Sequence, residues 1–122
     1  MSENETTADR PMSTNAAALG EIIWLMSRSA RHQWFFMADI EWMLMPPILL
    51  GQYRLFHDEE GRPIGVALWA KASDLVAKRL AAGHSRLAPD DWRSGDTNWL
   101  AEIIAPFGGL SSVFGRCIWI VT

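Results

Sequence analysis

The 122-residue sequence contains a single cysteine, Cys117, and this shortage excludes two kinds of small protein. One cysteine cannot form an internal disulfide framework, and it cannot supply the thiolates of a Cys-based structural zinc site. The three histidines are not at metal-ligand spacing either, so we expect no metal site. The length predicts one small domain.

Positive charge is also in short supply. The chain has 11 Lys and Arg against 14 Asp and Glu, a formal net charge of -3. A protein held to nucleic acid by phosphate neutralisation is normally basic, so we expect no nucleic-acid partner. Glycine-rich phosphate loops of the Walker or Rossmann type are missing, as is a Gly-x-Ser-x-Gly nucleophile elbow.

Long hydrophobic runs and targeting signals are missing as well. The richest apolar stretch, residues 34–50, is interrupted by two acidic residues and by Pro46-Pro47, so it cannot supply the roughly 20 apolar residues of a membrane span. Residues 1–15 are polar and mildly acidic, with no secretory signal pattern. We therefore expect a cytoplasmic protein with a disordered tail over residues 1–15 and a single domain over residues 16–122.

Tryptophan, in contrast, is abundant. Seven tryptophans in so short a chain predict a bulky core or a groove, and a hydrophobic fraction of 49% excludes a wholly disordered protein. Apolar residues at helical spacing follow Asn15, a good N-cap, and predict a helix over residues 16–29. A second helix is expected over residues 34–45, ending at Pro46-Pro47 because the residue before a proline disfavours the α region.

The rest of the chain alternates between strand and helix patterns. Strands over residues 52–57 and 64–70 predict a β-hairpin, and residues 99–105 and 117–121 predict two further strands. A short helix runs to about Ala82, and we expect Ser73 to cap it and Leu75 and Val76 to lie in its buried stripe. This order of elements predicts an α+β fold, an α/β sandwich.

Two residues have side chains that do not suit their predicted surroundings. His32 lies in a polar segment between two apolar helices, where it is either a general base or an ordinary surface histidine. Glu102 interrupts an apolar strand, and strict alternation puts it on one face with Leu100 and Ile104. It either reaches solvent from an edge strand or occupies a functional site, where the cost of burying a carboxylate is tolerated.

Other polar residues allow two readings each. Ser29 lies close enough to His32 in the sequence to form a dyad, although serines near histidines are common. Ser94-Gly95-Asp96 is typical of an Asx-type turn. Arg28 and Arg31 are either solvated charges or contacts to an acidic partner.

Five short motifs occur in one order at fitting separations. They are Ser27–His32, Leu44–Leu55, Leu68–Ala70, Asp91–Asp96 and Ile104–Gly108. Over about residues 18–110 the chain thereby resembles the RTX protoxin-activating lysine acyltransferases of the haemolysin-activator type.

The resemblance implies a cytoplasmic bacterial enzyme with a GNAT-like acyltransferase fold. Such enzymes take a fatty acyl group from acyl carrier protein and attach it to the ε-amine of internal lysines in an RTX protoxin. No cofactor is implied, since the donor is itself a thioester. Family members are often dimeric, so a homodimer is a further expectation.

The resemblance also assigns the site. The family's catalytic histidine falls on His32, and its catalytic acid falls on Glu102, where the family pattern has aspartate. An imidazole from the first loop and a carboxylate from a distant strand should therefore converge. Four further residues are expected to bind substrate: Ser29, Arg31, Trp69 and Asp96. Arg28, Arg31 and Arg54 are expected to dock the acidic carrier protein.

Two departures from the family pattern leave an alternative open. Glu102 is one methylene longer than aspartate, and the sequence stops soon after Gly108, which predicts a fold truncated at the C-terminus. The alternative is a catalytically impaired remnant that acts only as a binding module. A third reading is an acyltransferase whose acceptor is not a toxin.

Overall fold

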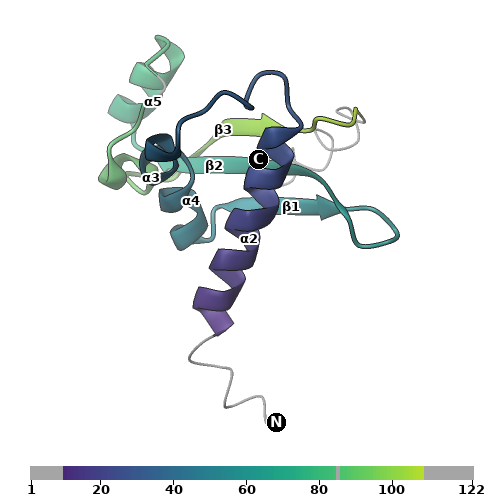
Figure 1. Ribbon diagram of the computed structural model, residues 1–122. Helices are drawn as coiled ribbons and strands as arrows, with labels where there is room; N and C mark the ends of the chain where they lie inside the picture. Colours follow the sequence, from purple (N-terminus) through teal and green to yellow (C-terminus); the bar gives the residue numbers. More distant parts are fainter. Residues whose placement is uncertain (1–9, 85, 109–122) are drawn as a thin grey trace.

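The computed structural model describes residues 10–84 and 86–108, which form helices and one antiparallel sheet (Figure 1). The helical elements are α2 (Arg10–Ser27), η1 (Met37–Asp39), α3 (Ile40–Met43), α4 (Met45–Leu50), α5 (Asp74–Ala81) and η2 (Pro89–Trp92). The strands are β1 (Tyr53–His57), β2 (Pro63–Ala72) and β3 (Thr97–Ile104). The predicted α+β class is confirmed, whereas the strand predicted over residues 117–121 and Cys117 lie outside the described residues.

The sheet has the order β1-β2-β3, and both neighbouring pairs are antiparallel. The predicted β-hairpin is confirmed by the pairing of Tyr53 with Leu68 and of Leu55 with Val66. Its turn is closed by Asp58, whose carboxylate accepts hydrogen bonds from the backbone N–H groups of Glu60 and Arg62, both at 2.9 Å. The long strand β2 is thus the centre of the described sheet.

One face of the sheet carries the main core. Figure 1 shows α2 crossing this face, with α3 and α4 beside it. The buried residues of this cluster come from all these elements: Ile22, Leu25, Met26, Met43, Leu44, Ile48, Val66, Leu68 and Ile104. Each such side chain contributes about 1.5–3 kcal/mol through removal from water, so the packing holds the end of α2 firmly against the sheet.

A β-bulge in β3 decides which side chains face the helices. Glu102 pairs with Leu68, but Trp69 pairs with Leu100, so Ala101 is an extra residue in β3. Glu102 and Ile104 therefore share the helix-covered face, while Leu100 packs on the opposite face. The predicted common face of Glu102 and Leu100 was wrong, because strict alternation does not hold across a bulge.

The first two helices differ from their predicted bounds. α2 begins at Arg10, so Asn15 lies within the helix instead of capping it, and the expected tail over residues 1–15 overlaps six helical residues. Within the second helix, predicted over residues 34–45, α3 covers only Ile40–Met43, and it ends ahead of Pro46-Pro47 as predicted. The prediction missed that a further helix, α4, starts at Met45, directly before these prolines. Both prolines lie in the first turn of α4, where the backbone N–H that proline lacks is not needed for helical hydrogen bonds.

Helix α5 follows the prediction in its caps but not in its face. The Ser73 hydroxyl accepts a hydrogen bond from the Val76 N–H at 3.2 Å, as expected of an N-cap. Val76 is buried, but Leu75 is 70% exposed, so its predicted place in the buried stripe was wrong. With Trp92 of η2, Val76 belongs to a second core cluster at the far end of the helix-covered face.

Candidate active site

The turn that follows α2 holds His32. After the helix ends at Ser27, the backbone N–H groups of His32 and Gln33 both donate to the Ser29 carbonyl oxygen, at 3.1 and 2.9 Å. This tight turn directs the imidazole into the protein, where the His32 side chain is only 4% exposed. The reading of His32 as a surface histidine was therefore wrong.

His32 lies between two oxygen atoms. Its Nδ1 is 2.6 Å from the Ser29 hydroxyl, and its Nε2 is 3.1 Å from Glu102 Oε1. Because a carboxylate only accepts, the neutral ring carries its proton on Nε2 and its Nδ1 accepts from the Ser29 hydroxyl. The predicted convergence of His32 and Glu102, 70 residues apart, is confirmed.

Glu102 owes this position to the bulge at Ala101. Its side chain is 22% exposed and lies on the helix-covered face, so it does not simply reach solvent from an edge strand. A carboxylate in this place stabilises a protonated imidazole and also fixes the orientation of the neutral ring. Ser29, His32 and Glu102 thus form a hydrogen-bonded chain that can accept and return a proton.

Two small cavities, each of about 110 Å³, flank this chain. The first includes His32, and its walls are mainly apolar: Ile23, Met26, Phe36, Met37 and Ile40. The second includes Glu102, and its walls carry more aromatic rings: Trp42, Met43, Leu68 and Trp92. Phe35 lines both cavities, and its ring stands nearly edge-on to the His32 ring at 5.7 Å between centroids.

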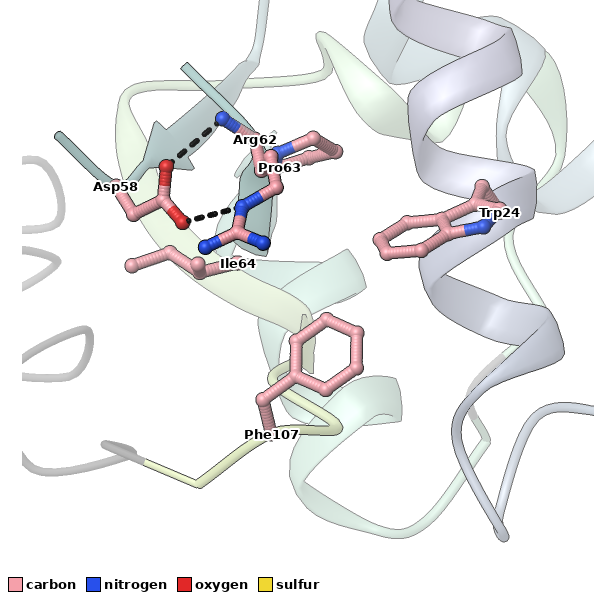
Figure 2. Close-up of a pocket in the computed structure, with 6 residues that line it drawn as sticks. All are labelled: Trp24, Asp58, Arg62, Pro63, Ile64 and Phe107. Carbon is pink, nitrogen blue, oxygen red and sulfur yellow. Dashed lines mark hydrogen bonds and ion pairs between the residues drawn. The ribbon is translucent and has the colours of Figure 1, made fainter. Parts of the chain in front are cut away.

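A larger cavity, of about 420 Å³, lies elsewhere. Figure 2 shows Trp24 and Phe107 on two of its sides, with Ile64 and the Asp58–Arg62 ion pair on another. Neither His32 nor Glu102 is among its lining residues, so size alone does not locate the candidate site.

Not all the predicted substrate-binding residues gather at this site. Ser29 contacts His32 directly, and Arg31 is exposed next to it in the chain. Trp69 lies on the opposite face of the sheet from Glu102, because its neighbour Leu68 is the partner of that glutamate. Asp96 lies in the bend just before β3, whereas Glu102 lies near the other end of that strand.

The turn that contains Asp96 has a structural role. The Ser94 hydroxyl accepts from the Ser73 N–H at 2.9 Å and donates to the Asp91 carbonyl at 3.0 Å. A Cβ on Gly95 would lie 2.6 Å from the Ala72 carbonyl oxygen, so only glycine fits this approach. The segment thereby ties the start of β3 to the end of β2, as the turn reading of the sequence suggests.

Comparison with known proteins decides the family. The model of the RTX toxin acyltransferase family matches residues 12–119. The chain belongs to the RTX toxin acyltransferase family. The matched range contains Ser29, His32 and Glu102.

Three relatives illustrate the range of this family. Lysine-acyltransferase RtxC of Vibrio cholerae is 34% identical over 90 residues, which cover 74% of this chain and 59% of the relative. The RTX-II toxin-activating lysine-acyltransferase ApxIIC of Actinobacillus pleuropneumoniae is 34% identical over 96 residues, or 79% and 59% of the two chains. An uncharacterised protein of Synechocystis, sll0720, is 36% identical over 91 residues, or 74% and 62%. Across these matches, the chain spans about 60% of the length of its relatives.

The described part of the chain holds neither a metal-binding cluster nor a membrane-spanning helix. Among residues 10–84 and 86–108, no three His, Cys, Asp or Glu side chains gather in a way that could hold a metal ion. In the same part of the chain, no helix has the length and apolar character needed to cross a membrane.

Sequence reasoning missed part of the site. Phe35 and Trp42 belong to the aromatic-rich stretch that follows His32, but their position in the walls of one cavity beside Glu102 could not be read from the sequence. Trp92 comes from η2, far along the chain, and nothing local links it to His32 or Glu102. Only the packing of η2 against β2 and α4 brings it to this cavity.

Proposed function

We propose that this member of the RTX toxin acyltransferase family transfers a fatty acyl group from acyl carrier protein to the ε-amine of internal lysines in an RTX protoxin. The reaction would take place in the cytoplasm, where acyl carrier protein is found, and would need no cofactor. The observation that carries the proposal is the Ser29–His32–Glu102 hydrogen-bonded chain, in which the imidazole is buried. The names of two relatives, a lysine acyltransferase and a toxin-activating lysine acyltransferase, support the acceptor and the reaction type.

The acceptor explains why a base is needed. A lysine amine has a reference pKa of about 10.4, so at pH 7 only about one in 2,500 is neutral, equivalent to roughly 4.6 kcal/mol. Only the neutral amine can attack the thioester. In the proposed mechanism His32 is the base, Glu102 orients the ring and stabilises its charged form, and the Ser29 hydroxyl relays the proton to Nδ1.

The transfer step balances with these groups alone. The bound ammonium gives its first proton to the Ser29–His32–Glu102 chain, which passes it to solvent, and the amine nitrogen then attacks the thioester carbonyl carbon. The new N–C bond forms, the C–S bond breaks, and the second amine proton passes through Ser29 to His32. The thiolate of the carrier leaves with that proton, which regenerates neutral His32. A route through an ester on the Ser29 hydroxyl uses the same three residues and is distinguished by experiment below.

The donor would approach from the His32 side. The cavity there is lined by the apolar side chains of Ile23, Phe36 and Met37, which suit an acyl chain, and it ends at His32. Phe36 and Met37 are 76% and 82% exposed, so the cavity opens to the outside of the protein. Arg28 and Arg31 are exposed next to it and would attract an acidic carrier protein.

Arg54 does not fit this docking surface. It pairs with Ala67, on the opposite face of the sheet, and its guanidinium lies 5.6 Å from the Phe56 ring centroid. The proposed carrier surface therefore consists of Arg28 and Arg31 without Arg54.

Two further properties belong to the same proposal. A GNAT-like fold is compatible with a sheet of three antiparallel strands covered by helices on one face. We also propose a homodimer as the working assembly, as for many members of the family.

The test is a transfer assay. The protein is incubated with acyl-acyl carrier protein and an RTX protoxin fragment, and mass spectrometry looks for a fatty acyl increment on lysine. We expect the increment with the wild-type chain and its loss with His32→Ala. If the wild-type chain binds the fragment without adding any acyl group, the binding-module reading is correct and the proposal is wrong. Acylation of a different protein instead would show an acceptor that is not a toxin.

A further inference from the structure

The cavity on the Glu102 side of Phe35 has walls unlike those of the first cavity. Three aromatic rings line it, from Phe35, Trp42 and Trp92, together with a single carboxylate, that of Glu102. Aromatic faces and a carboxylate are the groups that proteins use to bind an alkyl ammonium, because both attract a cation and the rings also cover its methylenes.

The carboxylate has capacity for a second partner. Oε1 of Glu102 lies 3.1 Å from His32 Nε2, whereas Oε2 has no hydrogen-bond partner within residues 10–84 and 86–108. An ammonium group bound to Oε2 would lie close to His32, because the other oxygen of the same carboxylate is hydrogen-bonded to the imidazole. A charge-assisted hydrogen bond at a partly buried carboxylate is also stronger than one in water.

The aromatic wall is held in place by a hydrogen bond, and one of its rings, that of Trp42, already lies close to a cation. The Trp42 indole N–H donates to Asp39 at 2.9 Å, and the Arg86 guanidinium lies 5.0 Å from the Trp42 ring centroid. Trp92 is 3% exposed, and its buried indole N–H has no acceptor in the part of the chain that the structure describes. Leaving such a donor unpaired costs stability, which is tolerated most readily where a ligand completes the site.

We propose that this second cavity binds the side chain of the acceptor lysine, with its ammonium on Glu102 and its methylenes between Phe35 and Trp42. That the bound lysine is the acceptor rests on the proposed function. The acyl chain and the lysine would then lie on opposite sides of Phe35 and be bound at the same time. Once neutral, the amine would leave Glu102 for the thioester at the Ser29 end of the hydrogen-bonded chain, where its second proton passes to Ser29.

The acyl chain is the less suitable occupant of this cavity. An alkyl chain would have to cover the Glu102 carboxylate without offering it a hydrogen bond, which is unfavourable. The first cavity, in contrast, has no carboxylate among its lining residues within the described part of the chain. The difference in charge between the two cavities assigns the lysine side chain to the second cavity and the acyl chain to the first.

A binding experiment tests the site without any turnover. The indole N–H signals of the ¹⁵N-tryptophan-labelled full chain are followed by NMR, with Trp92→Phe and Trp42→Phe used to assign two of them. A glycine-flanked lysine peptide should shift both signals, and the same peptide with norleucine, which lacks only the amine, should not. Equal shifts with both peptides, or none with either, would overturn the proposal.

Variants extend the test to the carboxylate and to catalysis. Glu102→Gln keeps the shape and removes the charge, so it should weaken lysine-peptide binding by about tenfold. In the transfer assay, Trp42→Leu should raise KM for the lysine substrate and Met37→Ser should raise KM for the acyl donor, whereas Leu75→Ser on exposed α5 should change neither. If both cavity variants raise the same KM, the assignment of the lysine and the acyl chain to separate cavities is wrong, even though the protein transfers acyl groups. Lysine-specific shifts without any transfer would support the binding site and contradict the proposed function.

Discussion

The protein contains two histidine–carboxylate pairs of almost equal length in very different surroundings. His32 and Glu102 are 3.1 Å apart with side chains 4% and 22% exposed, whereas His57 and Glu21 are 3.0 Å apart with side chains 37% and 35% exposed. The first pair has Ser29 as a third member and lies between two cavities. The distance between the two groups therefore does not distinguish a candidate active site, and burial and the third partner do.

Solvent explains why these differences matter. Water and salt screen the exposed pair, so its ion pair contributes little to stability and does not hold the His57 ring in one orientation. Around His32, the ring has a fixed neighbour on each nitrogen, and the Phe35 ring covers one side of it. Such an environment fixes the tautomer and orientation that proton transfer requires.

The largest expected effect is the loss of the buried imidazole. His32→Ala should lower the rate of lysine acylation by about 10²–10⁴-fold, the usual contribution of a general base. His57→Ala, the matched change in the exposed pair, should leave the rate within experimental error. Steady-state transfer assays on both variants make the comparison, and an equal loss in the two would remove the distinction between the pairs.

Removing the charge of the partly buried carboxylate should have the next largest effect. Glu102→Gln keeps a side chain of the same length but no longer stabilises the protonated ring, and we expect a fall in acylation rate of about 10²-fold or more. Glu21→Gln is the control.

Glu102→Asp tests how far the carboxylate must extend towards His32, since moving it by about 1 Å should lower the rate by up to roughly 10²-fold. A Glu102→Asp variant as active as wild type would show that the strand can adjust its position.

A Ser29 variant distinguishes two roles of its hydroxyl, the relay of a proton and covalent attack on the acyl group. If its hydroxyl only relays a proton, Ser29→Ala should lower the rate by about tenfold, since water can take its place. We also expect no acyl adduct on the wild-type enzyme in a reaction stopped before the acceptor is added. Trapping of an ester on Ser29 by mass spectrometry would contradict the relay. Thr97→Val, which removes an exposed hydroxyl at the start of β3 and lines neither cavity, is the control.

The smallest expected effect concerns an exposed turn close to His57. The backbone N–H of Arg62, aided by its guanidinium, holds the pKa of Asp58 below its ordinary value. A lowered folded-state pKa means that the stabilisation is present above about pH 4, the unfolded value, and is lost as the pH falls through the folded value. The difference in thermal stability between wild type and Asp58→Asn should therefore shrink from pH 6 to about pH 3. A difference that does not change with pH would contradict this account, with Glu59→Gln as the control.

Much of the fold follows from local patterns in the sequence. The hairpin turn, the Ser73 cap and the strand around Glu102 were predictable because each has a local signal in turn residues, a capping residue or a short apolar run. Pro46-Pro47 misled the prediction, because the same residues stop one helix or start the next, and only the surrounding packing decides.

The site was predictable only in part. The resemblance brought His32 and Glu102 together, whereas periodicity could not, because the bulge at Ala101 depends on the pairing of β3 with β2 and has no local signal. The same resemblance also suggested Trp69 and Asp96, which the sheet places on another face and at the far end of the strand. Trp92 could not be found from sequence at all, since its place depends on how η2 packs.

The most direct test of the account is the tautomer of His32. Long-range ¹H–¹⁵N NMR of the imidazole nitrogens, at a pH where the ring is neutral, distinguishes a protonated Nε2 from a protonated Nδ1. We predict that His32 occupies a single Nε2–H form in the wild-type chain, that Glu102→Gln disturbs this form, and that His57 shows averaged signals in both. An averaged His32 signal that does not respond to Glu102→Gln would contradict the central claim that these residues form one preorganised proton-transfer chain.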